Sequence, residues 1–234
     1  MELPTGWLTP GSNEKLWGRG GTYKTIAYEA LPPLQGPLDG SFDWLAAAPS
    51  RADGMELSRD EDGDEVEAAP IATLLAKRIA EAKRAKLVIP PSFTRFMTDE
   101  TLFTRVPSCT ACYWELGPCL VRIPDHDGPE RLLRFMNDQQ ACALWYLLLL
   151  PDGDHRVVFA RPDLSEEANE DPFQKDVVPR DVTLCAPSFE AFIKRFWLEN
   201  TLWYAVRTGA ALTGELSDYI EAADRSIASG LVQR

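Results

Sequence analysis

Histidine, cysteine and long hydrophobic runs are scarce in this sequence. Its 234 residues include two histidines and five cysteines, and the longest apolar run, Ala141 to Leu150, has ten residues. A membrane-spanning helix needs about 20 apolar residues, so we expect no membrane partner. The first residues, Met1 to Pro4, lack the basic stretch and apolar core of a secretory signal. Together these absences predict a cytoplasmic protein.

Positive charge is also in short supply. Lys and Arg number 24 against 36 Asp and Glu, which gives a formal net charge of −12. Nucleic-acid binding depends on a basic surface that neutralises phosphates, so the sequence predicts no nucleic-acid partner. The same charge favours a basic protein partner, because opposite charge speeds association. Hydrophobic residues at 45% and charged residues at 26% are typical of a globular domain.

The cysteines do not form a recognisable framework. An odd, sparse set is unlike a disulfide-stabilised secreted domain and indicates reduced thiols. Cys109 and Cys112 form a Cys-x-x-Cys pair, but zinc needs four donors, and the other candidates are scattered along the chain: Cys119, His126, Cys142 and Cys185. We therefore expect no cofactor and small packed thiols. A zinc- or thiol-dependent activity at Cys109 and Cys112 stays as an alternative.

No catalytic motif is evident. The two histidines, His126 and His155, lie in segments predicted to be hairpin turns, and neither a G-x-S-x-G sequence nor a nucleophilic lysine motif occurs. The carboxylates lie in acidic loops, where nothing separates the pKa values of an acid–base pair. The sequence therefore favours a non-enzymatic protein.

The first fifty residues predict an irregular arm. They contain six prolines and seven glycines, which interrupt helices and strands. Disordered linkers are poor in aromatic residues, yet this stretch includes Trp7, Trp17 and Trp44. We expect an arm over residues 1–50 that its aromatic side chains hold on the main domain, with a short helical turn within 41–48.

An acidic linker is predicted over residues 51–69. Residues 51–67 hold eight acidic and two basic side chains, and their spacing does not fit a calcium loop. One interpretation is a solvated run that complements the N-terminus of the helix that follows. The other is a partner-binding patch, whose candidate residues are Asp60, Glu61, Asp62, Asp64 and Glu65.

Two helices are predicted to open the main domain, which we place at residues 70–207. Residues 71–86 carry apolar side chains at helical spacing, namely Ile71, Leu74, Leu75, Ile79 and Ala82. Pro90-Pro91-Ser92 can begin a shorter helix, since proline is tolerated in a first turn. Its inward-facing residues are predicted to be Phe93, Phe96 and Met97.

Short apolar segments separated by turn signals follow, at residues 109–116, 119–123, 132–136, 142–150 and 156–160. Parallel strands would need a dozen or more residues per connection, so this spacing predicts an antiparallel meander. Gln139 and Gln140 lie at a predicted hairpin tip, and we include them among the candidate partner-binding residues.

Two helices are predicted to end the chain. The first begins near Ser188, a suitable N-cap, and Glu199 and Asn200 lie on or beside its apolar face. These two polar residues either tie the helix to the sheet or arm, or line a recognition groove. Residues 208–234 are predicted to contain an amphipathic tail helix.

These residues together resemble a known family. The segments are Leu87-Val88-Ile89-Pro90-Pro91-Ser92-Phe93, then Leu132 to Gln140, then Trp145-Tyr146-Leu147, then Ser188 to Phe192 and Phe196 to Asn200. In this order they are similar to the SUKH superfamily and, within it, to bacterial SMI/KNR-like proteins. The resemblance covers about residues 70 to 207.

The resemblance implies an α+β fold, with an antiparallel sheet flanked by helices, and a non-enzymatic role. Many bacterial members resemble immunity proteins that neutralise toxin domains, often nucleases, and fungal relatives act as scaffold-like regulators. The family supplies no catalytic residues to transfer. The leading hypothesis is an immunity protein for a basic toxin domain, and the alternative is a cytosolic regulatory adaptor with an endogenous partner.

Overall fold

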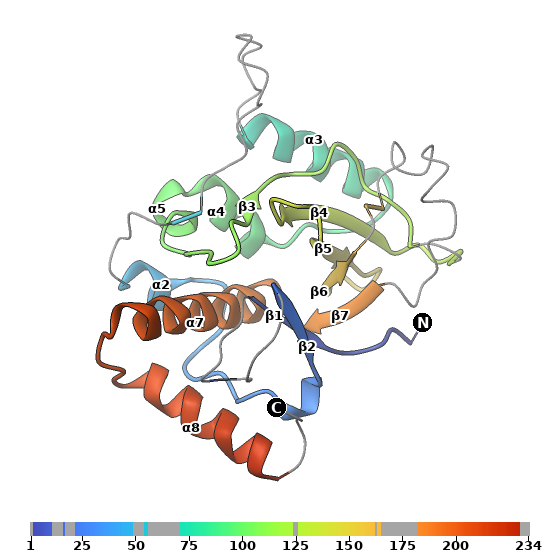
Figure 1. Cartoon of the computed structure of the whole chain (residues 1–234). Coiled ribbons are helices and arrows are strands. Elements are labelled where there is room, and N and C mark those ends of the chain that lie inside the picture. The colour runs from blue at the N-terminus through green and yellow to red at the C-terminus, as the bar shows by residue number, and fades with distance from the viewer. Residues whose placement is uncertain are drawn as a thin grey trace.

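The computed structural model has a mixed α+β architecture and describes residues 2–10, 16, 22–48, 54–55, 71–123, 126–161, 163–164 and 182–229 (Figure 1). The strands of its main sheet are β3 (Tyr113–Trp114), β4 (Arg131–Asn137), β5 (Leu144–Leu149), β6 (His155–Ala160) and β7 (Val182–Ala186). The helices are α2 (Asp43–Ala46), α3 (Ile71–Arg84), α4 (Pro91–Thr98), α5 (Glu100–Phe103), α7 (Phe189–Thr208) and α8 (Glu215–Ala228). The predicted α+β class is confirmed.

The main sheet is the predicted meander. Its strand order, β3-β4-β5-β6-β7, follows the chain, and every neighbouring pair is antiparallel. The turn between β5 and β6 contains Gly153 with a φ of +83°, a left-handed conformation that glycine adopts without strain. Because successive side chains of a strand point to opposite faces, the strand residues form two hydrophobic clusters, one on each face of the sheet.

Some predicted strand boundaries are wrong. In the segment 109–116 only Tyr113 and Trp114 form a strand, and 119–123 contributes a single bridge between Val121 and Leu132. The last strand, β7, was not predicted. Both short segments contain or adjoin turn-forming residues, and their apolar side chains pack without continuous pairing.

Helix α7 covers one face of the sheet. Ser188 is its N-cap and accepts a hydrogen bond from the amide of Ala191, as predicted, and Gly209 ends the helix with a φ of +69°. Rings from α7 pack at right angles on rings of the sheet: the centroids of Phe135 and Phe189 are 5.2 Å apart. Such edge-to-face packing suits the quadrupoles of aromatic rings.

The opposite side of α7 is buried as well, because the arm and α8 cover it (Figure 1). The amine of Lys194 lies 2.7 Å from a carboxylate oxygen of Glu215 in α8. The guanidinium of Arg195 donates to the hydroxyl of Tyr219 and to the carbonyl of Pro32. Over Phe189–Asn200 every residue except Trp197 is buried, so this part of the helix is enclosed on all sides and shows little amphipathicity.

The described residues of the arm contain a 3-10 turn, Tyr28–Ala30, a small antiparallel sheet of β1 (Trp7–Pro10) and β2 (Tyr23–Ile26), and the short helix α2. The predicted helical turn is α2. Trp7 and Phe42 belong to the same hydrophobic cluster as the main sheet and α7. The amide of Gly6 and the carbonyl of Leu184 also pair, so the start of the arm extends the sheet beside β7.

The remaining helix predictions hold with two corrections. Helix α4 buries Phe93, Phe96 and Met97, as predicted. In α3, however, Ile79 is 40% exposed, because only part of the predicted apolar stripe meets α4. The tail helix α8 begins at Glu215, after a loop that includes Gly214. None of the helices in the described part of the chain combines the length and apolar character needed to cross a bilayer.

Candidate functional site

The hairpin tip between β4 and β5 is the first candidate site, and we define it as residues 138–142. Gln139, Gln140 and Cys142 are exposed there, whereas Asp138 is 2% exposed. The backbone of the tip closes on itself, since the amide of Asp138 donates to the carbonyl of Ala143 and the amide of Ala141 donates to that of Asp138. The predicted glutamines therefore project from a short, internally bonded turn.

The carboxylate of Asp138 holds this turn. One oxygen accepts hydrogen bonds from the amides of Gln140 and Cys142, at 2.9 and 3.3 Å. The other accepts from the hydroxyl of Tyr23 in the arm. A buried carboxylate is costly unless its lone pairs are satisfied, and here three donors satisfy it. The arm and the hairpin are thus joined at the tip.

A loop at residues 108–112 packs against the same tyrosine. The hydroxyl of Tyr23 lies 3.1 Å from the hydroxyl oxygen of Thr110 and 3.4 Å from the sulfur of Cys112. Burial, together with the neighbouring thiol and carboxylate, raises the pKa of Tyr23, so it remains a donor. Ser108 accepts from the amide of Cys112 at 2.8 Å. Within the described part of the chain this loop pairs with no strand, and side chains fix it instead.

The two cysteines of the Cys-x-x-Cys pair are packed thiols. Cys112 is buried and Cys109 is half-buried. Burial is the main cause that raises the pKa of Cys109 to about 12, and it also raises the pKa of Cys112. A thiol of raised pKa is a poor nucleophile and a poor metal ligand at neutral pH. Within the described residues, no three His, Cys, Asp or Glu side chains gather closely enough to hold a metal ion.

Side chains of helix α7 hold the loop 108–112 through hydrogen bonds to its backbone. Asn200 accepts a hydrogen bond of 2.7 Å from the amide of Cys109, and Tyr204 donates to the carbonyl of Ser108. Glu199 is fully buried and accepts from Trp7 and from Tyr219. Glu199 and Asn200 therefore tie segments together, in line with the first of their two interpretations, and neither is available to line a groove.

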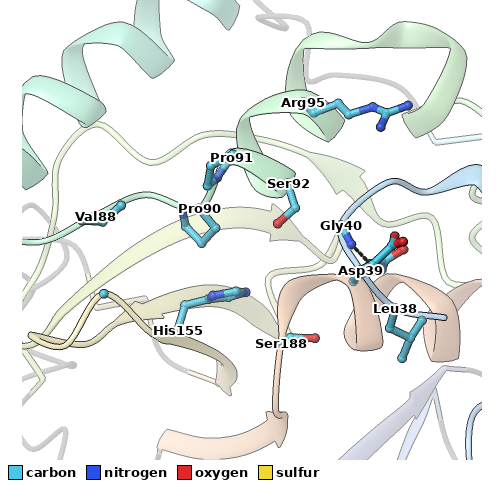
Figure 2. A pocket seen from close by; sticks show the side chains of 12 residues that line it. Leu38, Asp39, Gly40, Val88, Pro90, Pro91, Ser92, Arg95, His155 and Ser188 are labelled. Atoms are coloured by element: carbon cyan, nitrogen blue, oxygen red, sulfur yellow. Dashed lines mark hydrogen bonds between the residues drawn. The ribbon is translucent and has the colours of Figure 1, made fainter.

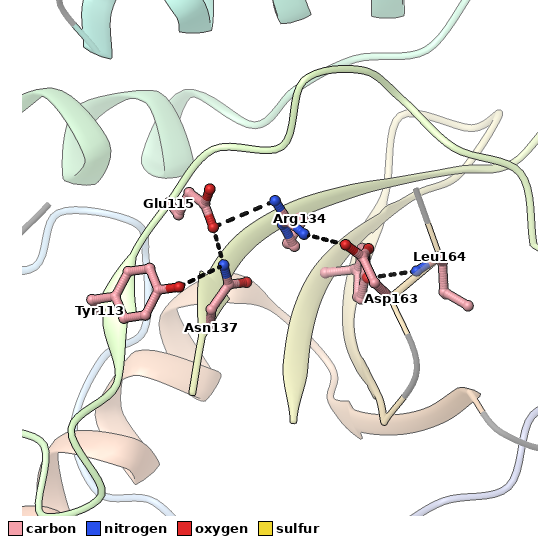
Figure 3. Close-up of polar contacts among 7 residues, drawn as sticks. Tyr113, Glu115, Arg134, Asn137, Asp163 and Leu164 are labelled. Carbon is pink, nitrogen blue, oxygen red and sulfur yellow. Dashed lines mark hydrogen bonds and ion pairs between the residues drawn. The ribbon is translucent and has the colours of Figure 1, made fainter. Parts of the chain in front are cut away.

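A second polar network fixes the strand that carries the tip (Figure 3). Arg134 in β4 lies 2.6 Å from a carboxylate oxygen of Asp163 and 3.4 Å from one of Glu115. Asn137, three positions after Arg134 in β4, donates to Glu115 and to the hydroxyl of Tyr113. Asn137 directly precedes Asp138, so the base of the hairpin tip is anchored to β3 and the residue after it.

Backbone strain occurs at this site. Ala111 and Ala141 have φ values of 54° and 53°, in the left-handed region that costs an L-residue about 1–2 kcal/mol. Strain of this kind often accompanies functional sites, where the surrounding contacts impose it. Both alanines are exposed, one in the loop 108–112 and one in the hairpin tip.

The predicted acidic candidates Asp60, Glu61, Asp62, Asp64 and Glu65 lie outside the described residues. The described residues contain 17 Lys and Arg against 20 Asp and Glu, a net charge of −3, compared with −12 for the whole chain. Most of the surplus negative charge therefore belongs to the other segments. The described part of the chain, which we call the body, is close to neutral.

A groove of about 660 Å³ at the other end of α7 is the second candidate site, and sequence reasoning missed it (Figure 2). Its lining comes from the arm, from the residues before and within α4, from the β5–β6 turn and from the start of α7: Leu38, Asp39, Gly40, Val88, Pro90, Pro91, Ser92, Arg95, Gly153, His155, Ser188 and Glu190. These segments are far apart in the sequence, and no local motif marks their meeting.

His155 lies in this groove rather than in a turn, which corrects the sequence prediction. It is the first residue of β6 and is half-buried, and its Nε2 accepts a hydrogen bond of 3.1 Å from the amide of Phe189. Burial lowers the pKa of His155, while the nearby Asp154 acts in the opposite direction. The imidazole is therefore neutral at pH 7, with one nitrogen already engaged.

Comparisons with known proteins do not identify the chain: no protein-family model, curated protein or solved structure matches it.

Proposed function

We propose that this chain is a non-enzymatic protein-binding module, an immunity protein that binds and neutralises a basic, nuclease-like toxin domain. It would act in the cytoplasm, where such a toxin reaches its substrate. The resemblance to SUKH proteins implies this role, and the antiparallel sheet with its covering helix agrees with the fold that the resemblance implies.

The hairpin tip is the observation that carries the proposal. Gln139 and Gln140 are exposed, while Asp138 beneath them is bonded to the arm and to the amides of its own turn. A pre-ordered surface loses little conformational entropy when it binds. Exposed amides offer both donors and acceptors, which suits the polar surface of a folded partner.

Charge supports a two-part recognition. The near-neutral body provides the contact surface, and the acidic residues Asp60 to Glu65 attract a basic partner over distance. Steering of this kind raises the association rate more than it slows dissociation, and it weakens as salt shortens the Debye length to about 8 Å at physiological ionic strength.

Two observations favour binding over thiol or histidine chemistry. The thiols of Cys109 and Cys112 have raised pKa values because they are buried. The Nε2 of His155 accepts a backbone amide, so that nitrogen is occupied as a hydrogen-bond acceptor.

The test pairs the purified chain with the proteins encoded on either side of its gene, each immobilised in turn. We expect one of them to be a basic domain whose nuclease activity is lost when one equivalent of the chain is added. Its association rate should fall at least about tenfold between 50 and 300 mM NaCl. Replacing both Gln139 and Gln140 with alanine should speed dissociation.

The matched control is Gln35→Ala, an exposed glutamine on the arm, which should leave binding unchanged. A second control replaces Asp60, Glu61, Asp62, Asp64 and Glu65 with their amides, and it should slow association without changing dissociation. Binding of a neighbour that has no toxic activity would support the adaptor instead. Absence of binding, or an association rate that ignores salt, would contradict the proposal.

A further inference from the structure

The backbone that borders the groove has an unpaired stretch between two paired ends: the Leu87 amide donates to the carbonyl of Ala82, and the Pro90 carbonyl accepts from the amide of Thr94. Helix α3 ends at Arg84, and Lys86 has a φ of 59°. The segment Leu87–Pro90 follows and leads to α4. Pro90 has φ −60° and ψ 140°, an extended conformation. Among the described residues, the amides and carbonyls of Val88 and Ile89 make no hydrogen bond. Buried or half-buried backbone groups are nearly always paired, so this segment offers unused donors and acceptors.

The side chains of this segment alternate as they do in a strand. Leu87 and Ile89 are buried, whereas Val88 between them is 53% exposed, the most exposed large hydrophobic side chain in the described part of the chain. In Figure 2, Val88 and Pro90 follow one side of the groove, His155 lies below them, and Leu38 to Gly40 lie across from Ser92. An apolar side chain therefore lines the groove next to free backbone groups.

The far side of the groove is fixed in place. Gly40 has a φ of +85°, and a Cβ added there would lie 3.0 Å from the Cβ of Ser92. The amides of Gly40 and Phe42 donate to the carboxylate of Glu190. The arm thus closes tightly on α4 at one end, and the opening between them keeps a defined width.

The charge of the lining is slightly negative. Asp39 and Glu190 provide two carboxylates, Arg95 provides one guanidinium, and His155 is neutral because burial lowers its pKa. Asp39 is fully exposed, and bonds from Ser41 are the main cause that lowers its pKa, with Arg95 a minor one. The groove therefore favours a segment that carries positive charge near Asp39.

We propose that this groove binds an extended peptide segment of a partner protein, which pairs through its main chain with the amide and carbonyl of Val88. An apolar side chain of the peptide contacts Val88, and a basic side chain faces Asp39. Strand addition of this kind gains affinity from backbone hydrogen bonds and specificity from alternate side chains. A volume of about 660 Å³ is within the usual range for ligand sites.

This inference does not depend on the hairpin tip. The lining residue Glu190 and the loop-supporting Tyr204 are 14 positions apart on α7, which separates the two sites by about 20 Å along the helix. A change at one site is therefore expected to leave the other intact.

The test selects a phage-displayed library of random heptapeptides against the intact chain, and the enriched peptides are synthesised with a fluorophore. We expect alternating apolar residues with at least one Lys or Arg. Val88→Ser should weaken binding at least tenfold, and Asp39→Asn by about threefold. N-methylation of alternate peptide amides should abolish binding, and hydrogen exchange at the Val88 amide should slow when peptide is bound.

Matched controls share the chemistry but not the location. Ile79→Ser removes the other exposed large hydrophobic residue, and Asp43→Asn removes an exposed carboxylate of the arm. Both should change affinity less than twofold, as should alanine at Gln139 and Gln140. The inference is overturned if no peptide is enriched, if Val88→Ser leaves binding intact, or if N-methylated peptides bind equally well.

Discussion

The indole Nε1 of Trp7 donates a hydrogen bond of 2.7 Å to Oε2 of Glu199, at the centre of the buried side of α7. The other oxygen of Glu199 accepts from the hydroxyl of Tyr219 at 2.8 Å. One carboxylate without exposure thus joins the arm, the long helix and the tail helix. Loss of a hydrogen-bond donor to Glu199 is therefore costly, because an unpaired buried charge is strongly destabilising.

Replacing Trp7 with phenylalanine should lower the free energy of unfolding by about 2–3 kcal/mol, since it removes a hydrogen bond to a charged group and creates a small cavity. Tyr219→Phe should cost a similar amount. Because both donors share Glu199 and the double variant removes both of them, it should lose more than the sum of the two single variants. Urea unfolding measures these values, and strict additivity would show that the two donors act independently.

Asp138→Ala should destabilise the hairpin tip more than the rest of the chain. It leaves the hydroxyl of Tyr23 and two turn amides without their acceptor, at a cost of about 1–3 kcal/mol. Hydrogen exchange at Gln140 and Cys142 should accelerate, with little change in α3. Asp138→Asn keeps one acceptor and should cost less. Equal exchange in both variants and wild type would show that the carboxylate does not hold the turn.

His155 should make stability depend on pH. Burial places its folded-state pKa below the ordinary histidine value of about 6.5, so the unfolded chain binds the proton more readily. Its contribution is therefore complete above about pH 6.5, and it is lost as the pH falls through that value toward the folded pKa.

His155→Gln keeps an acceptor for the amide of Phe189 and has no titrating group. Between pH 7 and 5 its stability should fall less than that of the wild type, as measured by urea unfolding at each pH. His126→Gln is the control and should keep the wild-type loss that arises from His155. Parallel pH curves for wild type and His155→Gln would contradict this assignment.

The cysteines should differ in their reactivity at pH 8 with an aromatic disulfide reagent that releases a coloured thiolate. Cys142 is exposed and should react first. Cys109, with a pKa of about 12, and the buried Cys112 and Cys185 should react only as the chain unfolds. Mass spectrometry of the labelled sites gives the order. Fast labelling of Cys109 would reopen the thiol-dependent alternative, as would stoichiometric zinc released by a chelator.

Local sequence signals predicted the elements that depend on local chemistry. Ser188 marks the start of α7, Pro91 the start of α4, and the turn at Gly153 the β5–β6 hairpin. The glutamines of the hairpin tip were found in the same way, because a turn sequence between two apolar runs is visible without any partner.

Features that depend on distant partners were missed. The strands β1 and β2 lie among prolines and glycines, and their pairing is set by how the arm packs on α7. Glu190, Lys194 and Arg195 are buried although their type predicts exposure, because the arm and α8 supply their partners. The groove joins Asp39, Val88 and His155 from three separate segments, and no periodicity connects them.

The bond between Trp7 and Glu199 also limits how early the arm can pack during protein synthesis. The two residues are 192 positions apart, and ribosomes add about 5–20 residues per second. Trp7 therefore waits about 10–40 s after its own synthesis before its acceptor exists. During that interval the arm emerges with its aromatic side chains uncovered, and a translation product that ends before α7 would present them permanently to chaperones and proteases.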